Sequence, residues 1–192
     1  MAIFTTMDMR EKQPYDSFRD GILALIGPNL IYSRVKYLGM QINEDYRGKE
    51  FVLVPVMLGG MVFCADLSRR LSIDAIIDPI SINSYEGTQS TGKFRLLLDT
   101  QTDLAGKDVL VIEDIVDSGR SLVYLKEHLK KKGPRSIRVA ALLSKPERRI
   151  VSVEADYTCF TVPDLFVVGY GLDYEGKYRN LPFVGVLDKE KL

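Results

Sequence analysis

The sequence predicts an α/β domain in which helices flank a mainly parallel, twisted sheet. Short runs of large or β-branched apolar residues alternate with segments of helical periodicity, and the clearest run, 109–112, shows no polar alternation. A strand of that kind is typical of a parallel sheet that is covered on both faces. A length of 192 residues, 46% of them hydrophobic, fits one domain spanning 1–192.

The first elements are predicted around two glycine-containing turns. Apolar residues at helical spacing over 17–31 predict an amphipathic helix, although Gly27-Pro28 favours a break within it or the start of another turn. Residues 51–54 are uniformly apolar and predict the first core strand. The turn at 55–60 supplies glycines for close backbone approach, and a helix is expected over 61–71.

In the middle of the chain, two strands are predicted on either side of a polar loop. Residues 75–83 and 94–98 are the strand candidates. Residues 84–93 contain two glycines and no apolar period, which predicts a mobile loop. The strand at 109–112 then leads into an amphipathic helix over 119–132.

The C-terminal part of the chain predicts a succession of short strands. No strong helical pattern separates the last of them, so a small β-rich region is expected beyond the parallel core. The strand candidates are 137–143, 157–160, 166–168 and 184–187.

The charge balance argues against a nucleic-acid or membrane partner. Lys plus Arg and Asp plus Glu number 26 each, so no overall field attracts polyanions. The first ten residues lack a basic region followed by a long apolar run, and no apolar span is long enough for a membrane helix. We therefore expect a cytoplasmic protein whose phosphate recognition is local.

Histidine and cysteine are too scarce to carry the chemistry. His128 is the sole histidine, which excludes histidine-based triads and most zinc sites, and we expect it to be structural or solvated. Cys64 and Cys159 form no Cys-x-x-Cys pair and are expected to be buried thiols. Carboxylates and lysines remain for any proton transfer.

Acidic residues and a predicted helix start follow the 109–112 strand. Glu113 and Asp114 come at its carboxyl end, the edge where ligands of open α/β sheets bind. Residues 118–121 read Ser-Gly-Arg-Ser, where hydroxyls, a glycine and first-turn N–H groups form a cradle for a phosphate monoester. Acids beside a phosphate site imply a ligand with sugar hydroxyls and a divalent cation, as in a ribose 5-phosphate. The P-loop pattern of nucleoside triphosphatases is absent.

The run 111–121, Val-Ile-Glu-Asp-Ile-Val-Asp-Ser-Gly-Arg-Ser, resembles the signature of type I phosphoribosyltransferases, which bind phosphoribosyl pyrophosphate (PRPP). Flanking segments narrow the resemblance to the hypoxanthine or hypoxanthine-guanine phosphoribosyltransferase family. It implies the type I phosphoribosyltransferase fold, with a mobile lid over about 84–93 and a small hood built from the chain termini, mainly 157–192. The flanking segments that match are 84–85 with 90–92, 143–145, 166–174 and 178–180.

For ribose and phosphate, the resemblance implies direct roles for the acidic strand end. Glu113 and Asp114 would hold the ribose hydroxyls of PRPP, directly or through water bound to Mg2+, and Asp173 would be a further Mg2+ ligand. Asp117 would be the general base that accepts the proton of purine N7, unless its main task is to cap the following helix. The 5-phosphate would lie against Ser118, Gly119, Arg120 and Ser121.

For the purine, the resemblance implies that Lys145 donates a hydrogen bond to the exocyclic O6. A 6-oxo group accepts there, whereas the 6-amino group of adenine donates, so this lysine should reject adenine. Phe166 would stack on the base and the main chain of Val167 would read its edge, although these residues alone are more typical of a core strand. Ser84 and Tyr85 would belong to the lid, with Tyr85 facing inward.

For pyrophosphate, the turn Leu58-Gly59-Gly60 resembles the pyrophosphate-binding loop of the family. The family usually has a lysine where this chain has Leu58, so binding here would depend on main-chain N–H groups. Arg179 would grip pyrophosphate with its planar fork of donors. The family often has a cis peptide in this turn, which makes Met57–Leu58 the candidate bond.

The activity that the resemblance implies is purine salvage. The enzyme would transfer 5-phosphoribosyl from PRPP to hypoxanthine, and also to guanine, with Mg2+ as cofactor and as a homodimer or homotetramer. Two alternatives stay open: a xanthine-preferring phosphoribosyltransferase and a PRPP-sensing regulator that binds nucleic acid. The neutral charge balance and the joint presence of Asp117, Lys145 and Asp173 disfavour the regulator.

Overall fold

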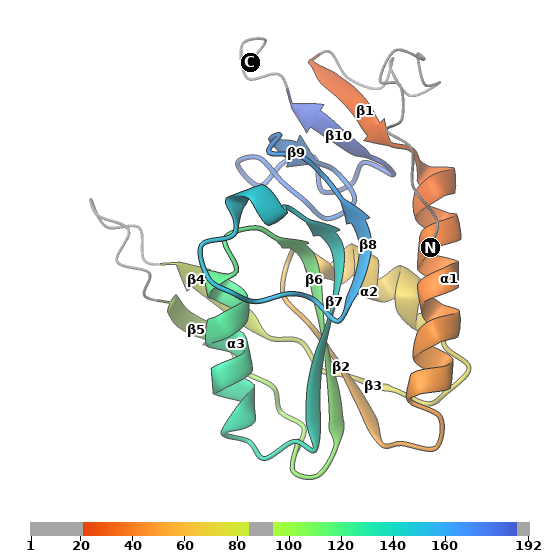
Figure 1. The fold of residues 1–192 in the computed structure, drawn as a ribbon, viewed down its shortest axis with the longest axis vertical. Helices are drawn as coiled ribbons and strands as arrows, with labels where there is room; N and C mark the ends of the chain where they lie inside the picture. Colours follow the sequence, from red (N-terminus) through yellow and green to blue (C-terminus); the bar gives the residue numbers. More distant parts are fainter. Residues whose placement is uncertain (1–20, 85–93, 188–192) are drawn as a thin grey trace.

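The computed structural model describes residues 21–84 and 94–187. A five-stranded sheet in the order β3-β2-β6-β7-β8 forms its centre, and every neighbouring pair is parallel (Figure 1). The predicted parallel sheet is confirmed. Its strands are β2 (Phe51–Pro55), β3 (Ile76–Ile77), β6 (Asp108–Val116), β7 (Ser136–Ser144) and β8 (Tyr157–Thr161).

Helices cover both faces of this sheet, which explains why its strands lack polar alternation. Helices α1 (Pro28–Asp45) and α2 (Gly60–Ser68) cover one face, and α3 (Arg120–Lys130) covers the other (Figure 1). Alternate residues of each strand enter two cores: Leu53 and Leu110 pack with α1 and α2, whereas Val52 and Val109 pack with α3. The apolar stripe of α3 is buried, at Leu122, Leu125 and Leu129.

A small antiparallel sheet forms the hood at the end toward which the parallel strands run (Figure 1). It contains β1 (Ile22–Ile26), β10 (Val184–Leu187) and β9 (Val167–Val168), in that order. Strand β1 pairs with β10 from Ile22 opposite Leu187 to Ile26 opposite Val184. Both ends of the described chain therefore build the hood, as the resemblance implied.

The expected helix over 17–31 is wrong for residues 21–27 and correct for 28–31, among the residues that the structure describes. Strand β1 occupies Ile22–Ile26, and α1 begins only at Pro28. Gly27 has an extended conformation, as the residue before a proline prefers, and proline suits the first helical position because it has no N–H to leave unpaired. The pattern at Gly27-Pro28 marked a helix start rather than a break.

The expected strand over 75–83 divides in two at Pro79, which has no N–H for a ladder bond. Its first part is β3, and its second part is β4 (Ser81–Ser84), which pairs antiparallel with β5 (Phe94–Leu98) apart from the main sheet. The loop expected over 84–93 lies outside the described residues, except for Ser84 at the end of β4.

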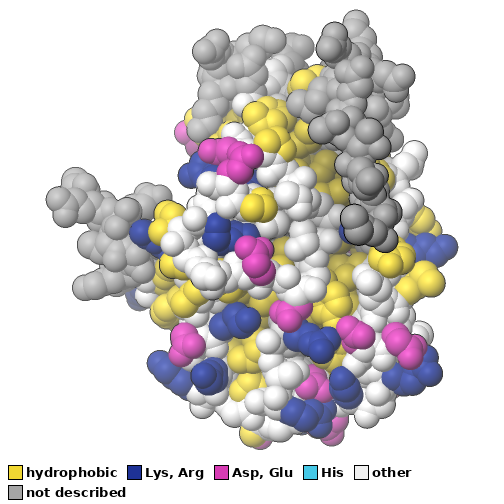
Figure 2. Space-filling model, in the orientation of Figure 1, with side chains coloured by type: hydrophobic (Ala, Val, Ile, Leu, Met, Phe, Trp, Pro, Cys, Tyr) yellow, Lys and Arg dark blue, Asp and Glu magenta, His cyan; other side chains and the backbone are white. Residues whose placement is uncertain are grey.

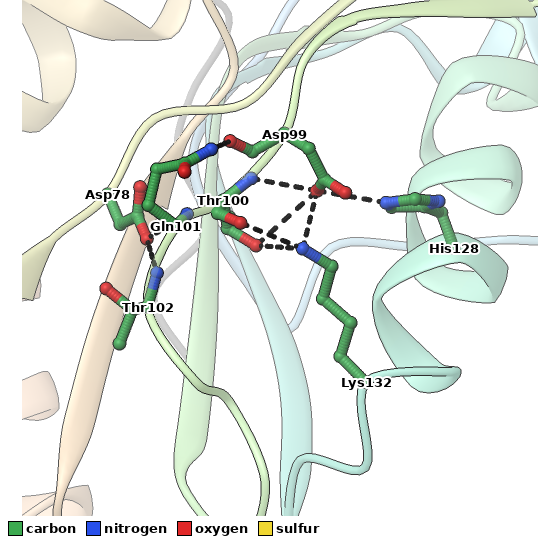
Figure 3. A network of polar contacts seen from close by, with 7 residues as sticks. All are labelled: Asp78, Asp99, Thr100, Gln101, Thr102, His128 and Lys132. Carbon is green, nitrogen blue, oxygen red and sulfur yellow. Dashed lines mark hydrogen bonds and ion pairs between the residues drawn. The ribbon is translucent and has the colours of Figure 1, made fainter.

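A polar network fastens the β4–β5 hairpin to α3 (Figure 3). His128 Nε2 lies 3.0 Å and Lys132 Nζ 2.7 Å from Asp99 Oδ1, directly after β5. Burial raises the pKa of Asp99, but these two partners outweigh it and hold that pKa below its ordinary value. His128 therefore has a structural role, as expected.

The two cysteines are buried, as expected from the sequence. Cys64 and Cys159 are buried free thiols, and burial raises the pKa of Cys64 to about 11 and that of Cys159 to about 12. Basic and acidic side chains intersperse on the face shown in Figure 2. Within the described ranges, no helix combines the length and the apolar character needed to cross a membrane.

Candidate active site

The predicted site residues gather where β2, β6 and β7 end, beneath the hood (Figure 1). Strand β6 is longer than the predicted 109–112 because β7 continues to pair with it after β2 has stopped. Pro55 is opposite Ile112, whereas the β7 ladder continues to Val116 opposite Ser144. Glu113 and Asp114 therefore lie within the C-terminal part of strand β6, rather than after it.

The two acids disfavour each other's charge. Glu113 is only 5% exposed, and burial together with neighbouring Asp114 raises its pKa well above the ordinary range. Burial raises the pKa of Asp114 to about 6, although main-chain N–H groups and Arg179 act in the opposite direction. Because burial disfavours the charged forms of both carboxyl groups, a cation bound beside them would favour their ionised forms.

The glycine turn before α2 packs directly on these acids. A Cβ at Gly59 would lie 1.9 Å from Asp114 Oδ2, and one at Gly60 would lie 2.3 Å from the carbonyl oxygen of Ile112. A side chain at Gly60 would collide with the backbone of β6, and one at Gly59 would displace the Asp114 carboxylate. The Met57–Leu58 peptide is cis, as the resemblance predicted, and Leu58 is 53% exposed.

The predicted phosphate cradle is the N-terminus of α3. Gly119 is the N-cap residue at φ 83°, and the first helical bond runs from Val123 N to the Gly119 carbonyl at 3.0 Å. The preceding N–H groups of the first turn thus have no partner within the helix. Because Gly119 is the N-cap, Asp117 does not cap α3.

A segment after β7 supports the cradle from behind. Ile150 N donates to the Ser118 carbonyl at 3.0 Å, and Arg149 Nη1 donates to the carbonyls of Val116, at 2.9 Å, and Asp117. A Cβ at Gly119 would lie 2.6 Å from Val153 Cγ1, so this glycine is needed for packing as well as for its positive φ.

The side chains predicted to bind the purine come from the end of β7 and from the hood. Lys145 is buried, its Nζ donates to the Leu165 carbonyl at 2.6 Å, and burial lowers its pKa. Phe166 is 39% exposed and packs edge-on against Tyr174 at 5.7 Å between ring centroids. Its ring therefore remains partly open to a ligand.

The main chain of Val167 faces away from its neighbour in the hood. Leu187 N donates to the Phe166 carbonyl at 2.9 Å, and Val167 is opposite Val186 in the antiparallel ladder. Hydrogen-bonded and non-hydrogen-bonded pairs alternate in such a ladder, so Val167 is in a non-hydrogen-bonded pair. Its N–H and carbonyl point to the free edge of β9, where they could contact a base.

The hood turn that carries Asp173 contacts the glycine turn of the core. A Cβ at Gly171 would lie 2.2 Å from the Gly59 carbonyl oxygen. Arg179 Nη1 donates to the Gly171 carbonyl at 2.6 Å, and its Nη2 lies 2.7 Å from Asp173 Oδ1. Asp173 and Arg179 are near enough to Asp114 to raise and lower its pKa, respectively.

Not every predicted contact is present. Within the described residues, no three His, Cys, Asp or Glu side chains are arranged to hold a metal ion, and Asp173 is paired with Arg179 instead of joining Glu113 and Asp114. Tyr85 lies outside the described residues, as does the side chain of Ser84. The three-acid Mg2+ set and the lid therefore stay predictions.

Two arginines at the site were missed as contributors. Arg148 Nε lies 2.9 Å from Asp117 Oδ1, and Arg149 braces the cradle. The β6–β7 register could have indicated both, because Val116 opposite Ser144 brings Asp117 next to Lys145 and the residues that follow it. That register is not visible in the sequence.

The sequence of this chain is similar to those of known proteins. The phosphoribosyl transferase domain family matches residues 28–175. A hypoxanthine-guanine phosphoribosyltransferase of Streptococcus thermophilus is 45% identical over 161 residues, 83% of this chain and 89% of the relative. One of Streptococcus pneumoniae is 43% identical over 167 residues, 86% of this chain and 93% of the relative.

Solved structures agree as well. A hypoxanthine phosphoribosyltransferase of Staphylococcus aureus has a TM-score of 0.87 at 38% identity and covers 93% of this chain and 98% of its own. A hypoxanthine-guanine phosphoribosyltransferase of Bacillus anthracis has a TM-score of 0.82 at 45% identity and covers 85% and 97%. The chain therefore belongs to the phosphoribosyltransferase family, among the enzymes named hypoxanthine-guanine phosphoribosyltransferases.

Proposed function

We propose that this enzyme transfers the 5-phosphoribosyl group of PRPP to hypoxanthine, and also to guanine, giving IMP or GMP and pyrophosphate. One observation carries the proposal: a single sheet edge joins the α3 cradle, the Glu113–Asp114 pair and the Lys145 ammonium. A phosphate, a sugar diol and a 6-oxopurine are complementary to these three parts in turn. The names of the similar proteins support the same reaction.

The phosphoribosyl group is placed by the β6–α3 segment. Its 5-phosphate lies against Ser118, Gly119, Arg120 and Ser121, where first-turn N–H groups and the helix dipole favour an anion. Its hydroxyl groups face Glu113 and Asp114. Pyrophosphate lies against the turn Leu58-Gly59-Gly60, and it competes with Asp173 for the guanidinium of Arg179.

The acid pair fits Mg2+ by its chemistry. Mg2+ prefers oxygen ligands and is usually held by one or two carboxylates together with substrate oxygens and water. Glu113 and Asp114 provide two such carboxylates, whose pKa values are raised mainly by burial. Asp173, once released by Arg179, is the third candidate ligand. When bound, Mg2+ neutralises charge on the departing pyrophosphate.

The purine is held between the hood and the end of β7. Lys145 has only one donor committed to the Leu165 carbonyl, and an ammonium carries three, so it can also bond O6 of a 6-oxopurine. Phe166 stacks on the purine ring. The main-chain N–H and carbonyl of Val167, at the edge of β9, form hydrogen bonds with polar atoms on the edge of the purine.

Bond formation needs a proton acceptor at purine N7. Asp117 is proposed as that base because it lies between the phosphate cradle and Lys145, and it accepts the proton as N9 attacks the anomeric carbon. The ribosyl centre becomes cation-like in the transition state, and water would also capture it. We propose that the lid with Ser84 and Tyr85 excludes water, and that the enzyme works as a homodimer or homotetramer.

A pyrophosphate-release assay with PRPP and Mg2+ tests this function. Hypoxanthine and guanine should support release, adenine should not, and chelation of Mg2+ should abolish the signal. Release with xanthine alone would replace the proposed acceptors with xanthine. A protein that binds nucleic acid and releases no pyrophosphate with any purine would be a regulator instead of an enzyme.

A further inference from the structure

Arg148 makes an unusual pair of contacts at the edge of the site. It ends the short 3-10 turn η1 (Pro146–Arg148), which directly follows Lys145. Its Nε lies 2.9 Å from Asp117 Oδ1, and its Nη1 donates to Asp164 Oδ1 at 3.2 Å. One guanidinium therefore bridges two carboxylates that are far apart in the sequence.

The bridge connects the two sides of the site that must meet during the reaction. Asp117 lies beside the phosphate cradle, whereas Asp164 precedes Leu165, whose carbonyl accepts the Lys145 ammonium, and then Phe166. Arg148 thus joins the proposed proton acceptor to the segment that presents the purine-stacking ring.

The bridge cannot be explained by stability alone. The side chains of Arg148, Asp117 and Asp164 are 51%, 40% and 49% exposed, and ion pairs with that exposure contribute little to folding because water screens them. The main chain of the same region is already fixed by Arg149, which donates to the carbonyls of Val116 and Asp117.

The geometry at Asp117 leaves its acceptor capacity available. Asp117 Oδ1 is buried and has no hydrogen-bond partner among the described residues, although Arg148 Nε is only 2.9 Å away. The guanidinium is therefore close but poorly aligned for a hydrogen bond. It can hold the carboxylate in place by charge while leaving lone pairs for a proton donor.

We propose that Arg148 is a positioning residue, which holds Asp117 in register with the purine through Asp164. This inference rests on the proposed function. Lys145 and Arg149 also lie near Asp117, and the Arg149 guanidinium is paired with Glu154. Arg148 is the cation whose side chain contacts the Asp117 carboxylate in the described part of the chain.

The first test compares Arg148→Gln with wild type in steady-state turnover of hypoxanthine. We expect kcat to fall about tenfold, because a small displacement of a reacting group is costly, while the KM for PRPP changes less than about twofold. Arg148→Lys keeps the charge but cannot bridge both carboxylates as a fork, so its kcat should be intermediate. Arg47→Gln is the matched control, because within the ranges that the structure describes Arg47 forms an ion pair only with exposed Glu44.

A second variant separates positioning from general structural support. Asp164→Asn breaks the other arm of the bridge and leaves Arg148 in place, so it should also lower kcat while the KM for PRPP changes little. A shared loss of kcat in Arg148→Gln and Asp164→Asn, with PRPP binding retained in both, is the signature of the bridge.

Three results would overturn the proposal. One is wild-type kcat in Arg148→Gln. Another is a rise in the PRPP KM that matches the loss of kcat, which would assign Arg148 to cradle support. The third is a folding defect in Arg148→Gln, seen by circular dichroism, together with wild-type kinetics in folded Arg148→Lys and Asp164→Asn. If wild type and Arg47→Gln release no pyrophosphate with any purine, the proposed function fails instead.

Discussion

At the scale of single residues, the chemistry follows from unequal environments of similar side chains. Glu113 and Asp114 share a site in which burial raises both pKa values, whereas Asp117 is partly exposed and lies beside Arg148. The first pair is suited to hold a cation and a sugar, and Asp117 is suited to exchange a proton. Groups of one chemical type thus take different tasks.

Replacing Asp117 with Asn tests its assignment as base. The amide keeps the shape but cannot accept the N7 proton, so kcat should fall about 10²- to 10⁴-fold. The KM for PRPP should change little, because the phosphate is held by the main chain of α3. Steady-state kinetics with hypoxanthine measures both constants, and an unchanged kcat would remove Asp117 from the reaction.

Replacing Lys145 with Ala tests purine selection. A hydrogen bond from a charged group is worth about 1.5 to 3 kcal/mol, so kcat/KM for hypoxanthine and guanine should fall about 10- to 100-fold. Lys130→Ala, at the exposed C-terminal turn of α3, is the control and should match wild type. Equal losses for hypoxanthine and adenine would show that Lys145 does not discriminate between them.

At the scale of elements, the sequence could predict what local pattern determines. The uniformly apolar strands and the stripe of α3 were predicted correctly because burial on both faces or on one stripe leaves a periodic signature. Strand β1 was not predicted, because among the described residues it pairs only with β10, which lies about 160 residues away in the chain. The extension of β6 to Val116 likewise depends on β7.

The same limit applies to the site. Motifs identified most of the residues that the structure brings to the sheet edge, but not the brace formed by Arg148 and Arg149, which depends on the β6–β7 register. The packing of Gly119 against Val153 could not be predicted either, because the local sequence indicates only that Gly119 lies in a turn.

Asp108 is a buried acid of β6 that bonds to residues at the start of β7, and it makes the stability of the fold depend on pH. Arg135 donates to Asp108 Oδ2 at 2.6 Å and Ser136 donates to Oδ1 at 2.5 Å, and the bonded Arg135 holds the pKa of Asp108 below its usual range. A group with a lowered folded pKa contributes stability above its unfolded pKa of about 3.9, and this stability is lost as pH falls through the folded pKa.

Asp108→Asn should therefore flatten the acid side of the stability curve. At pH 7 the variant should be less stable by about 1 to 2 kcal/mol, a modest figure because Arg135 is half exposed. Its deficit should shrink as pH is lowered from about 5 toward about 2. Urea unfolding at several pH values measures this, and parallel curves for variant and wild type would contradict it.

At the scale of the whole molecule, the site exists because two sheets meet. The parallel sheet contributes the acids, the cradle and Lys145, and the hood contributes Phe166 and Asp173. Close contact between Gly171 and Gly59 brings the two parts together over the site. A substrate that bridges phosphate, sugar and base can therefore contact both sheets at once.

A crystal structure of the enzyme with IMP and Mg2+ tests this arrangement most directly. The 5-phosphate should contact the main-chain N–H groups of 118–121, the ribose hydroxyls should face Glu113 and Asp114, and the base should lie on Phe166 with O6 near Lys145 Nζ. Nucleotide density elsewhere on the molecule, or side chains of the protein filling the 118–121 corner, would contradict the account.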